Sequence, residues 1–489
     1  MRKRMWIAVV AVLLLSMLAS GVMAQGINTG VGQTNIFMQN LGSGNAQVTV
    51  NFYRQDTGTL DWAYTIPDPI PPKGGKTLLY RDFGVGDNWA GAAELASTEP
   101  LAAIVNMFWE GNNTGAAYSG IDAPATDAFL PNLLKRAERQ TRVTVQNTEA
   151  TQATVSLKFY NRSGTLVGTF PDTIPGKAEK TYNLDDIAQC DFSVTSGVGS
   201  LHITSNTKIA TMASLHYSDG SAAYSGVSTG DTVIWGLGIF RRVNGDPNVE
   251  LNWKLYSAVI IQNLGSLRAD VTVNLIGKGA LPSTSFTDTI EPKASYGVNT
   301  KSRGTMPQDK WDAAIAALGA NWNGTLKATC TNGQPLAGVV LYWNRNTTPL
   351  LPDLAAYEAV RNSDATTNAL SMPAVYRKRW TPTMLQWSTS LVQNLDNTTG
   401  TINVKFFTTA GTAAGNPAGY DVELPANGSV GLNLKQQVNL PNQALTDLGE
   451  NFSGAMYITS TTGQHIIGNT IFFREDRNYA LGYSGFPVQ

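Results

Sequence analysis

The sequence predicts an all-β protein in which four tandem β-sandwich domains follow a cleaved signal peptide and form an elongated array. Three observations lead to this prediction. Charged residues make up only 15% of the 489 residues, and Val, Thr, Tyr and Phe recur between Gly, Pro and Asn. This composition favours short strands and turns over solvent-facing helices, which are rich in Lys and Glu. Marker sequences repeat four times, and a basic start followed by an apolar run opens the chain.

The first 24 residues have the features of a secretory signal. Residues 2–4 are basic, residues 5–24 carry no charge, and residues 22–24 fit the small-x-small cleavage pattern. We therefore expect export to the cell surface or the extracellular space, with a mature chain that begins near Gln25. The alternative is an uncleaved anchor, because the apolar run is nearly as long as a thin membrane span.

A Gln-Asn pair marks the same point in each predicted repeat. A polar stretch and a strand-like run follow it, and the penultimate residue of that run lies 13 positions after the Gln in every copy. The pairs are Gln39-Asn40, Gln146-Asn147, Gln262-Asn263 and Gln393-Asn394. Such spacing indicates one supersecondary unit repeated four times.

Two further markers support the repeat. A Pro-containing turn begins 28 or 31 positions after each Gln, and it separates strands because Pro fixes φ and cannot donate to a β-ladder. The turns start at Ile70, Ile174, Ile290 and Leu424. A late Tyr-Ser-Gly closes the first, second and fourth repeats at Tyr118, Tyr224 and Tyr483, and the third repeat lacks this tripeptide.

These markers imply about seven short strands in about 105 to 130 residues, which describes an immunoglobulin-like sandwich. We predict a signal peptide over residues 1–24 and repeats over residues 25–125, 126–231, 232–366 and 367–489. An apolar strand with a basic end joins consecutive repeats. Helical spacing over residues 309–318 predicts a short helix inserted in the third repeat.

The markers resemble those of secreted tandem repeat proteins of filamentous bacteria with CARDB-type, cell-adhesion-related, immunoglobulin-like domains. The resemblance is carried by the Gln-Asn pair, the Phe-Tyr strand, the Ile-Pro-Pro turn and the late Ala-Tyr-Ser-Gly, and residues 40–53 show it best. It covers nearly all of residues 34–489. The resemblance implies a sandwich fold and a role in adhesion, and it supplies no catalytic residues.

Reactive side chains do not form a recognisable pattern. The three histidines are His202, His216 and His465, of which the first two are expected on neighbouring strands where a metal is conceivable, although core or surface roles are favoured. Cys190 and Cys330 occupy different places in their repeats, so free buried thiols are favoured over a disulfide. We therefore predict no enzyme activity, no cofactor, and no catalytic or metal residues; ligand-binding residues stay unknown.

The formal charge is −1, which gives no reason to expect nucleic acid or an anionic membrane as a partner. The sequence thus predicts an exported structural or adhesive repeat protein that contacts other surface proteins, polysaccharide or itself. One alternative is a carbohydrate-binding array, in which late-strand aromatic residues such as Trp109 and Trp343 are exposed. Another is a filament subunit that assembles by strand addition between chains.

Overall fold

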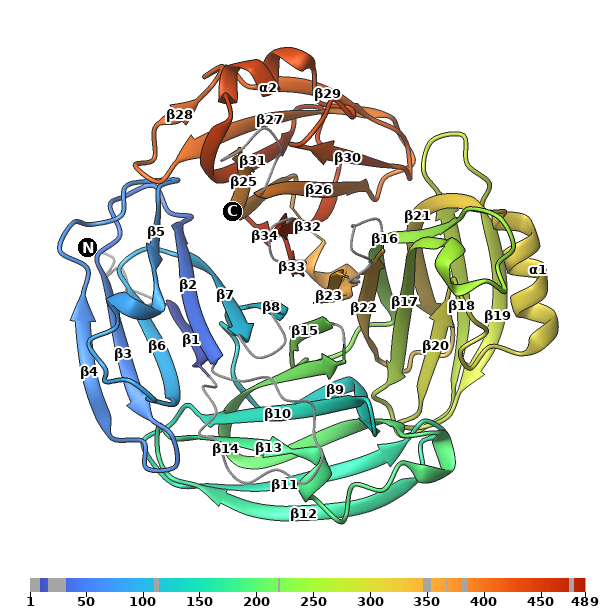
Figure 1. Cartoon of the computed structure of the whole chain (residues 1–489), viewed down its shortest axis with the longest axis horizontal. Coiled ribbons are helices and arrows are strands. Elements are labelled where there is room, and N and C mark those ends of the chain that lie inside the picture. Colours follow the sequence, from blue (N-terminus) through green and yellow to red (C-terminus); the bar gives the residue numbers. More distant parts are fainter. Residues whose placement is uncertain are drawn as a thin grey trace, which may run out of the picture.

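The computed structural model describes residues 9–15, 32–109, 114–218, 220–345, 353–365, 367–379, 386–474 and 479–488. Strands dominate these residues, so the predicted all-β class is confirmed (Figure 1). The strands fall into four consecutive groups, and each group pairs only within itself apart from one isolated bridge. We name these groups unit 1 to unit 4.

Units 1 and 2 contain mainly strands, with one short 3₁₀ helix in unit 1 and two in unit 2. Unit 1 comprises β1 (Val9–Leu15), β2 (Gly32–Asn40), β3 (Val48–Arg54), β4 (Leu60–Thr65), β5 (Gly75–Leu78), η1 (Tyr80–Asp82), β6 (Gly91–Ser97), β7 (Leu101–Trp109) and β8 (Thr114–Ser119). Unit 2 comprises β9 (Ala125–Arg136), β10 (Arg139–Asn147), β11 (Ala153–Asn161), β12 (Leu166–Ile174), β13 (Glu179–Asn183), η2 (Leu184–Asp186), η3 (Ser193–Thr195), β14 (Val198–Tyr217) and β15 (Gly220–Ser225).

Units 3 and 4 each add one α-helix. Unit 3 comprises β16 (Val233–Val243), η4 (Glu250–Asn252), β17 (Trp253–Asn263), β18 (Ala269–Gly277), β19 (Thr284–Ile290), β20 (Ser295–Asn299), α1 (Gln308–Leu318), β21 (Asn321–Cys330), β22 (Leu336–Asn344), β23 (Asp353–Glu358), β24 (Val360–Arg361) and η5 (Asn362–Asp364). Unit 4 comprises β25 (Ala369–Lys378), β26 (Gln386–Asn394), β27 (Gly400–Thr408), β28 (Ala413–Ala414), β29 (Tyr420–Leu424), β30 (Ser429–Asn433), α2 (Asn442–Leu448), β31 (Asn451–Ser460), β32 (Ile466–Arg474), β33 (Tyr479–Ser484) and β34 (Phe486–Pro487).

Every unit has an outer and an inner layer with the same antiparallel pairing order. The outer layers are β1-β6-β3-β4, β9-β14-β11-β12, β16-β21-β18-β19 and β25-β31-β27-β29. The inner layers are β5-β2-β7-β8, β13-β10-β14-β15, β20-β17-β22-β23 and β30-β26-β32-β33. In unit 2 the long strand β14 belongs to both layers. Alternation places the apolar side chains between the layers, as Val48, Val50 and Phe52 of β3 are fully buried.

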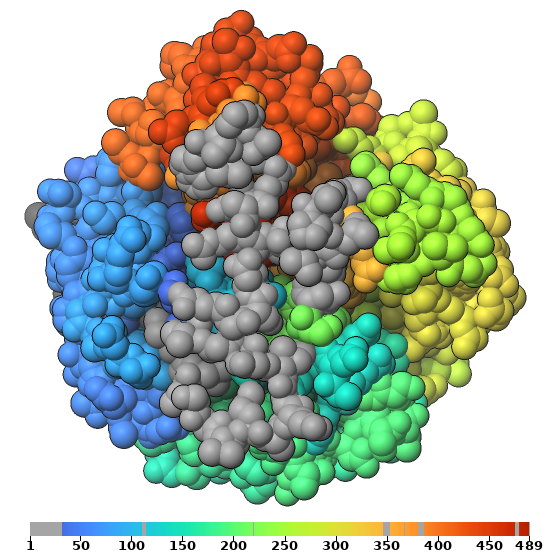
Figure 2. Space-filling model, in the orientation of Figure 1, coloured from blue at the N-terminus to red at the C-terminus, as the bar shows by residue number. Residues whose placement is uncertain are grey.

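The four units form a closed ring, and the elongated array predicted from the sequence is wrong (Figures 1 and 2). Unit 4 contacts unit 1, because the Ser371 hydroxyl donates to the Gln39 side-chain carbonyl and the Gly75 amide donates to the Thr409 carbonyl at 2.9 Å. The contact between the last unit and the first closes the ring. In the ring, the apolar surfaces of the inner layers are buried between neighbouring units, whereas an open rod would leave part of these surfaces exposed to water.

The hydrophobic cores continue across all four unit boundaries. The core of each unit contains side chains from the next unit around the ring: Met212 and Ala223 in unit 1, Ala258 and Ile260 in unit 2, Ile471 and Ala480 in unit 3, and Ile104 and Ala117 in unit 4. The strands β8, β15, β23 and β33 lie nearest the centre, and each contacts the next around the ring (Figure 1). The molecule is thus one packed body.

Two features concern what the sequence predicts for residues 309–318 and for residues 1–24. The predicted helix over residues 309–318 is confirmed as α1, and α2 fills the corresponding place in unit 4, where no helix was predicted. The strand β1 lies within the predicted signal peptide. It pairs with β6 at the position that β9, β16 and β25 hold in the other units. Cleavage of residues 1–24 stays a prediction. No helix in the described ranges has the length and hydropathy that crossing a bilayer requires.

Closure of the ring predicts a small radius of gyration. A compact chain of this length has a radius of gyration of about 23 Å, whereas a rod of four sandwiches would have about twice that value. We expect small-angle X-ray scattering of the purified protein to give the smaller value. A pair-distance distribution with a long tail, typical of a rod, would contradict the ring.

Candidate functional site

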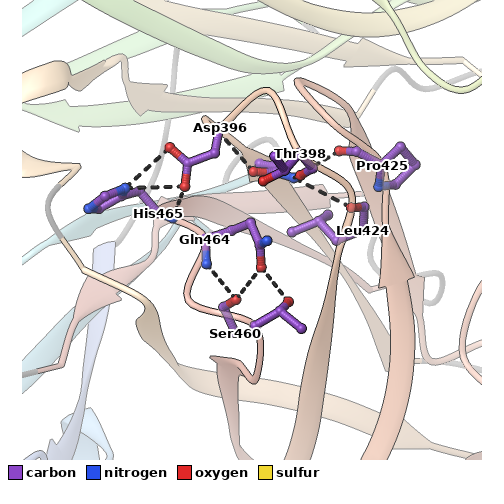
Figure 3. A network of polar contacts seen from close by, with 9 residues as sticks. Asp396, Thr398, Leu424, Pro425, Ser460, Gln464 and His465 are labelled. Atoms are coloured by element: carbon purple, nitrogen blue, oxygen red, sulfur yellow. Dashed lines mark hydrogen bonds and ion pairs between the residues drawn. The ribbon is translucent and has the colours of Figure 1, made fainter.

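The Asn of each Gln-Asn pair is a structural clamp. In unit 4 the amide nitrogen of Asn394 donates to the carbonyls of Thr398, Leu424 and Pro425 at 2.8, 3.4 and 3.0 Å (Figure 3). Its side-chain oxygen accepts from the Asp396 amide at 2.9 Å. One buried side chain therefore ties the end of β26 to its own turn and to the Pro-containing turn.

The same clamp is present in all four units. The other three Asn residues are also fully buried, and each donates to the carbonyl four residues ahead and to a carbonyl at the start of the Pro-containing turn: Asn40 to Gly44 and Ile70, Asn147 to Thr151 and Ile174, and Asn263 to Leu267 and Ile290. The two markers found by spacing are thus partners in one hydrogen-bond network. Buried polar groups of this kind stabilise the fold because unpaired backbone carbonyls are costly.

The late tyrosines form a second repeated contact. The Tyr483 hydroxyl donates to the Ala374 carbonyl at 3.0 Å, where a bulge interrupts the pairing of β25 with β31. Tyr224 makes the equivalent contact with Asn132 at 2.7 Å. Tyr357 of unit 3 donates to the Leu237 carbonyl at 2.7 Å. The third repeat therefore keeps the tyrosine of the Tyr-Ser-Gly marker, and only the Ser-Gly is replaced.

His202 and His216 lie in different halves of β14. His202 pairs with Phe129 of β9 in the outer layer, and His216 pairs with Gln140 of β10 in the inner layer. The two rings have different contact partners, and no hydrogen bond joins them in the described residues. His202 contacts Asp127 at 2.8 Å and stacks on Phe129, while burial holds the pKa of His216 well below its usual value. His465 lies beside Asp396 at 3.2 Å (Figure 3).

The cysteines are both buried and free, as predicted. Burial raises the pKa of Cys190 to about 12, so its thiol stays protonated and unreactive at neutral pH. Within the residues that the structure describes, no group of three or more His, Cys, Asp or Glu side chains is placed to hold a metal ion.

The late-strand aromatic residues connect neighbouring units. Four ring contacts cross the four boundaries: Trp109 with His216, Tyr217 with Trp343, Tyr342 with Phe473, and Phe108 with Tyr479. Trp109 is only 3% exposed, whereas Trp343 is half-buried. The expected platform of exposed, coplanar rings is therefore wrong for Trp109. Each aromatic pair adds about 0.5–1.5 kcal/mol beyond its area burial.

An axial pocket lies where the four innermost strands end. It has a volume of about 500 Å³ and is lined by the residues that follow the late tyrosine of every unit. These are Ser119, Ser225, Glu358 and Ser484 with the residues after them. The Ser-Gly marker therefore converges on one pocket, and unit 3 places a carboxyl group where the other units place a hydroxyl group.

Hydrogen bonds link these four positions around the axis. The Ser225 hydroxyl donates to the Ser119 carbonyl at 2.8 Å, and the Ser225 amide donates to the Glu358 carboxylate. The Ser484 hydroxyl donates to the Glu358 backbone carbonyl at 3.1 Å. Glu358 is partly buried at the edge of the pocket, and burial raises the pKa of its carboxyl group. The pocket can thus offer a hydrogen-bonding carboxyl group to a small polar ligand.

Sequence reasoning does not identify Glu358, because the lack of Tyr-Ser-Gly indicates only that the third repeat diverges from the others. The signal that could have found it is Ala355-Ala356-Tyr357, because the same Ala-Ala-Tyr precedes Ser119 in the first repeat and Ser225 in the second.

Comparisons with known proteins give little on function. A family of unknown function, DUF5719, matches residues 90–206, which run from the end of unit 1 into β14. No curated protein matches the chain. Among solved structures, the crystal structure of Thermotoga maritima 1070 is 17% identical, with 21% of this chain and 94% of that chain covered and a TM-score of 0.18. The Anabaena sensory rhodopsin transducer is 18% identical, with 19% and 96% covered and a TM-score of 0.16.

The Asn clamp predicts that replacing its amide nitrogen by an oxygen atom lowers the stability of the protein. In Asn394→Asp a carboxylate replaces the amide donor, so the clamped carbonyls lose their partner and a charge is buried. We expect a loss of about 1–3 kcal/mol or more in the free energy of unfolding, measured by urea denaturation. Asn397→Asp in the same turn is the control, because Asn397 is exposed and should change stability by less than about 0.5 kcal/mol. Equal midpoints for the two variants would contradict the clamp.

The axial carboxyl group predicts a pH-dependent stability. A carboxyl group whose pKa is higher in the folded than in the unfolded state favours folding when protonated, so ionisation of Glu358 destabilises the protein as the pH rises above about 4.5. We expect Glu358→Gln to melt at a higher temperature than the wild type at pH 7.5, with the difference shrinking toward pH 4. Glu423→Gln, at an exposed position in β29, is the control. A difference that does not vary with pH would rule out the effect.

Proposed function

We propose that this protein is an exported, non-enzymatic structural or adhesive component of a bacterial cell surface, built from four tandem immunoglobulin-like repeats. The observation that supports the proposal is that the repeated polar and aromatic residues contact other parts of the protein itself. The clamps of Asn40, Asn147, Asn263 and Asn394 and the late tyrosines all make contacts inside the ring. The repeated residues therefore make the ring rigid, as a scaffold requires.

Export rests on the signal-like pattern of residues 1–24. A rigid ring suits adhesion because the binding surfaces are preorganised, so that little conformational entropy is lost when a partner binds. The axial pocket and the clefts between units supply such surfaces.

Fractionation and N-terminal sequencing test this proposal. We expect the protein, expressed in a bacterial host with a C-terminal tag, to be found outside the cytoplasm with a mature N-terminus near Gln25. The purified mature ring should bind isolated cell-envelope material in a sedimentation assay. A cytoplasmic protein with an intact N-terminus would refute export, and failure to sediment with envelope material would refute adhesion.

A second candidate is the filament subunit, and β1 favours it. If residues 1–24 are removed, the edge of β6 loses the strand that pairs with it, and the backbone donors and acceptors of residues 91–97 can pair with a strand from another chain. The first strands of the other three units are already paired within their own unit. In the scattering measurement described above, a radius of gyration independent of concentration for a chain lacking residues 1–24 would reject the filament.

A further inference from the structure

Basic side chains from two units line a cleft between unit 2 and unit 3. Arg136 ends β9, Arg139 begins β10, and Arg162 lies in the turn after β11. Lys301 of unit 3 follows β20 on the opposite wall. Together they line a cavity of about 260 Å³, and an adjoining cavity of about 540 Å³ shares Arg136 and Arg162. The two cavities thus form one cleft with arginines at their junction.

The arginines in this cleft lack counter-charges. Among the described residues, no ion pair joins Arg136, Arg139 or Arg162 to a carboxylate. The ε nitrogens of Arg136 and Arg162 are buried and have no hydrogen-bond partner there. A buried donor without an acceptor and a buried charge without a partner are both unfavourable, and an oxyanion would satisfy both.

The nearby acidic groups do not compensate these charges. Glu250 contacts Lys301 at 2.5 Å and also pairs with Arg345, so its charge is already shared by two cations. Glu291 lines the wider cavity without an ion pair to the arginines in the described part of the chain. Burial, together with the charge of Arg136, lowers the pKa of Arg162 to about 10, which leaves Arg162 protonated at neutral pH.

Aromatic rings form another wall of the cleft. Tyr256 and Trp343 stack with centroids 5.0 Å apart and an interplanar angle of 13°. The Arg139 guanidinium lies 5.2 Å from the Tyr217 ring centroid, and the Lys301 ammonium lies 4.7 Å from that of Tyr256. The Tyr217 ring holds the Arg139 guanidinium in place and leaves its hydrogen-bond donors available to a ligand.

We propose that this cleft binds the oxyanion group of a small ligand, a phosphate, sulfate or carboxylate, through Arg136, Arg139 and Arg162. The site goes beyond the structural role proposed above and does not depend on it. It also shows that a chain with a net charge near zero can present a strongly basic site, because unit 2 and unit 3 each contribute cations to one boundary.

Three probes test the site and distinguish the kind of ligand. Inorganic phosphate, inorganic sulfate and D-glucuronate are titrated separately into the purified protein, with sodium chloride adjusted to keep the ionic strength constant. We expect at least one anion to raise the melting temperature and to bind with one-to-one stoichiometry by calorimetry. The preferred probe indicates a phosphorylated, sulfated or uronic-acid ligand.

Two cleft variants and one control locate the binding. Arg162→Gln should weaken binding of the preferred anion at least tenfold. Without the anion it should melt no lower than the wild type, because an uncompensated charge is removed. Arg139→Gln, at the exposed start of β10, should also weaken binding and leaves the buried residue untouched. Arg268→Gln is the charge-matched control, since this side chain is 59% exposed and lies outside the cleft.

Two results would overturn the proposal. One is the absence of any change in melting temperature with all three anions at constant ionic strength. The other is an equal affinity of the wild type, Arg162→Gln and Arg139→Gln for the anion that binds, because the anion would then occupy another place.

Discussion

The contact between each unit and the next is the constraint on which the rest of the structure depends. The Pro-containing turn of one unit lies against the sandwich of its neighbour: Lys177 of unit 2 contacts Glu94 of unit 1 at 3.0 Å, and Lys73 of unit 1 lies over the Phe407 ring of unit 4. Such a head-to-tail contact uses two different surfaces, so it either continues indefinitely or closes. Here it closes after four units, and closure buries the inner strands and the aromatic pairs at every boundary.

Near-equivalence of the units makes their differences informative. Three units place a serine beside the axial pocket, and unit 3 places Glu358 there, where burial opposes its ionisation. The boundary between units 2 and 3 gathers Arg136 and Arg162 without counter-charges. Both features disfavour the free protein, because a charge is removed from water without full compensation. A ring with continuous cores can tolerate them.

The polar residues that repeat in every unit, unlike those at which one unit differs, stabilise the fold. An Asn in every unit is fully buried and fully engaged with backbone carbonyls, so its repetition reflects the cost of leaving a turn unpaired. Repetition of a polar residue in a sandwich array is therefore better evidence for architecture than for chemistry. The sites with functional potential are the positions at which one unit differs, such as Glu358.

The sequence by itself determined the strand-rich class, the position of the clamps and the helix α1, because these depend on local alternation, turn chemistry and spacing. It could not determine the ring. Whether short joins lead to a rod or a ring depends on the angle between neighbouring units, which side chains such as Trp109 and His216 set across a boundary. The axial pocket exists only after closure, because all four units line it. The arginine cleft exists only after units 2 and 3 pack together, since Arg136 and Lys301 are far apart in the chain. Local patterns encode elements, and the summed packing of distant surfaces decides how those elements are arranged.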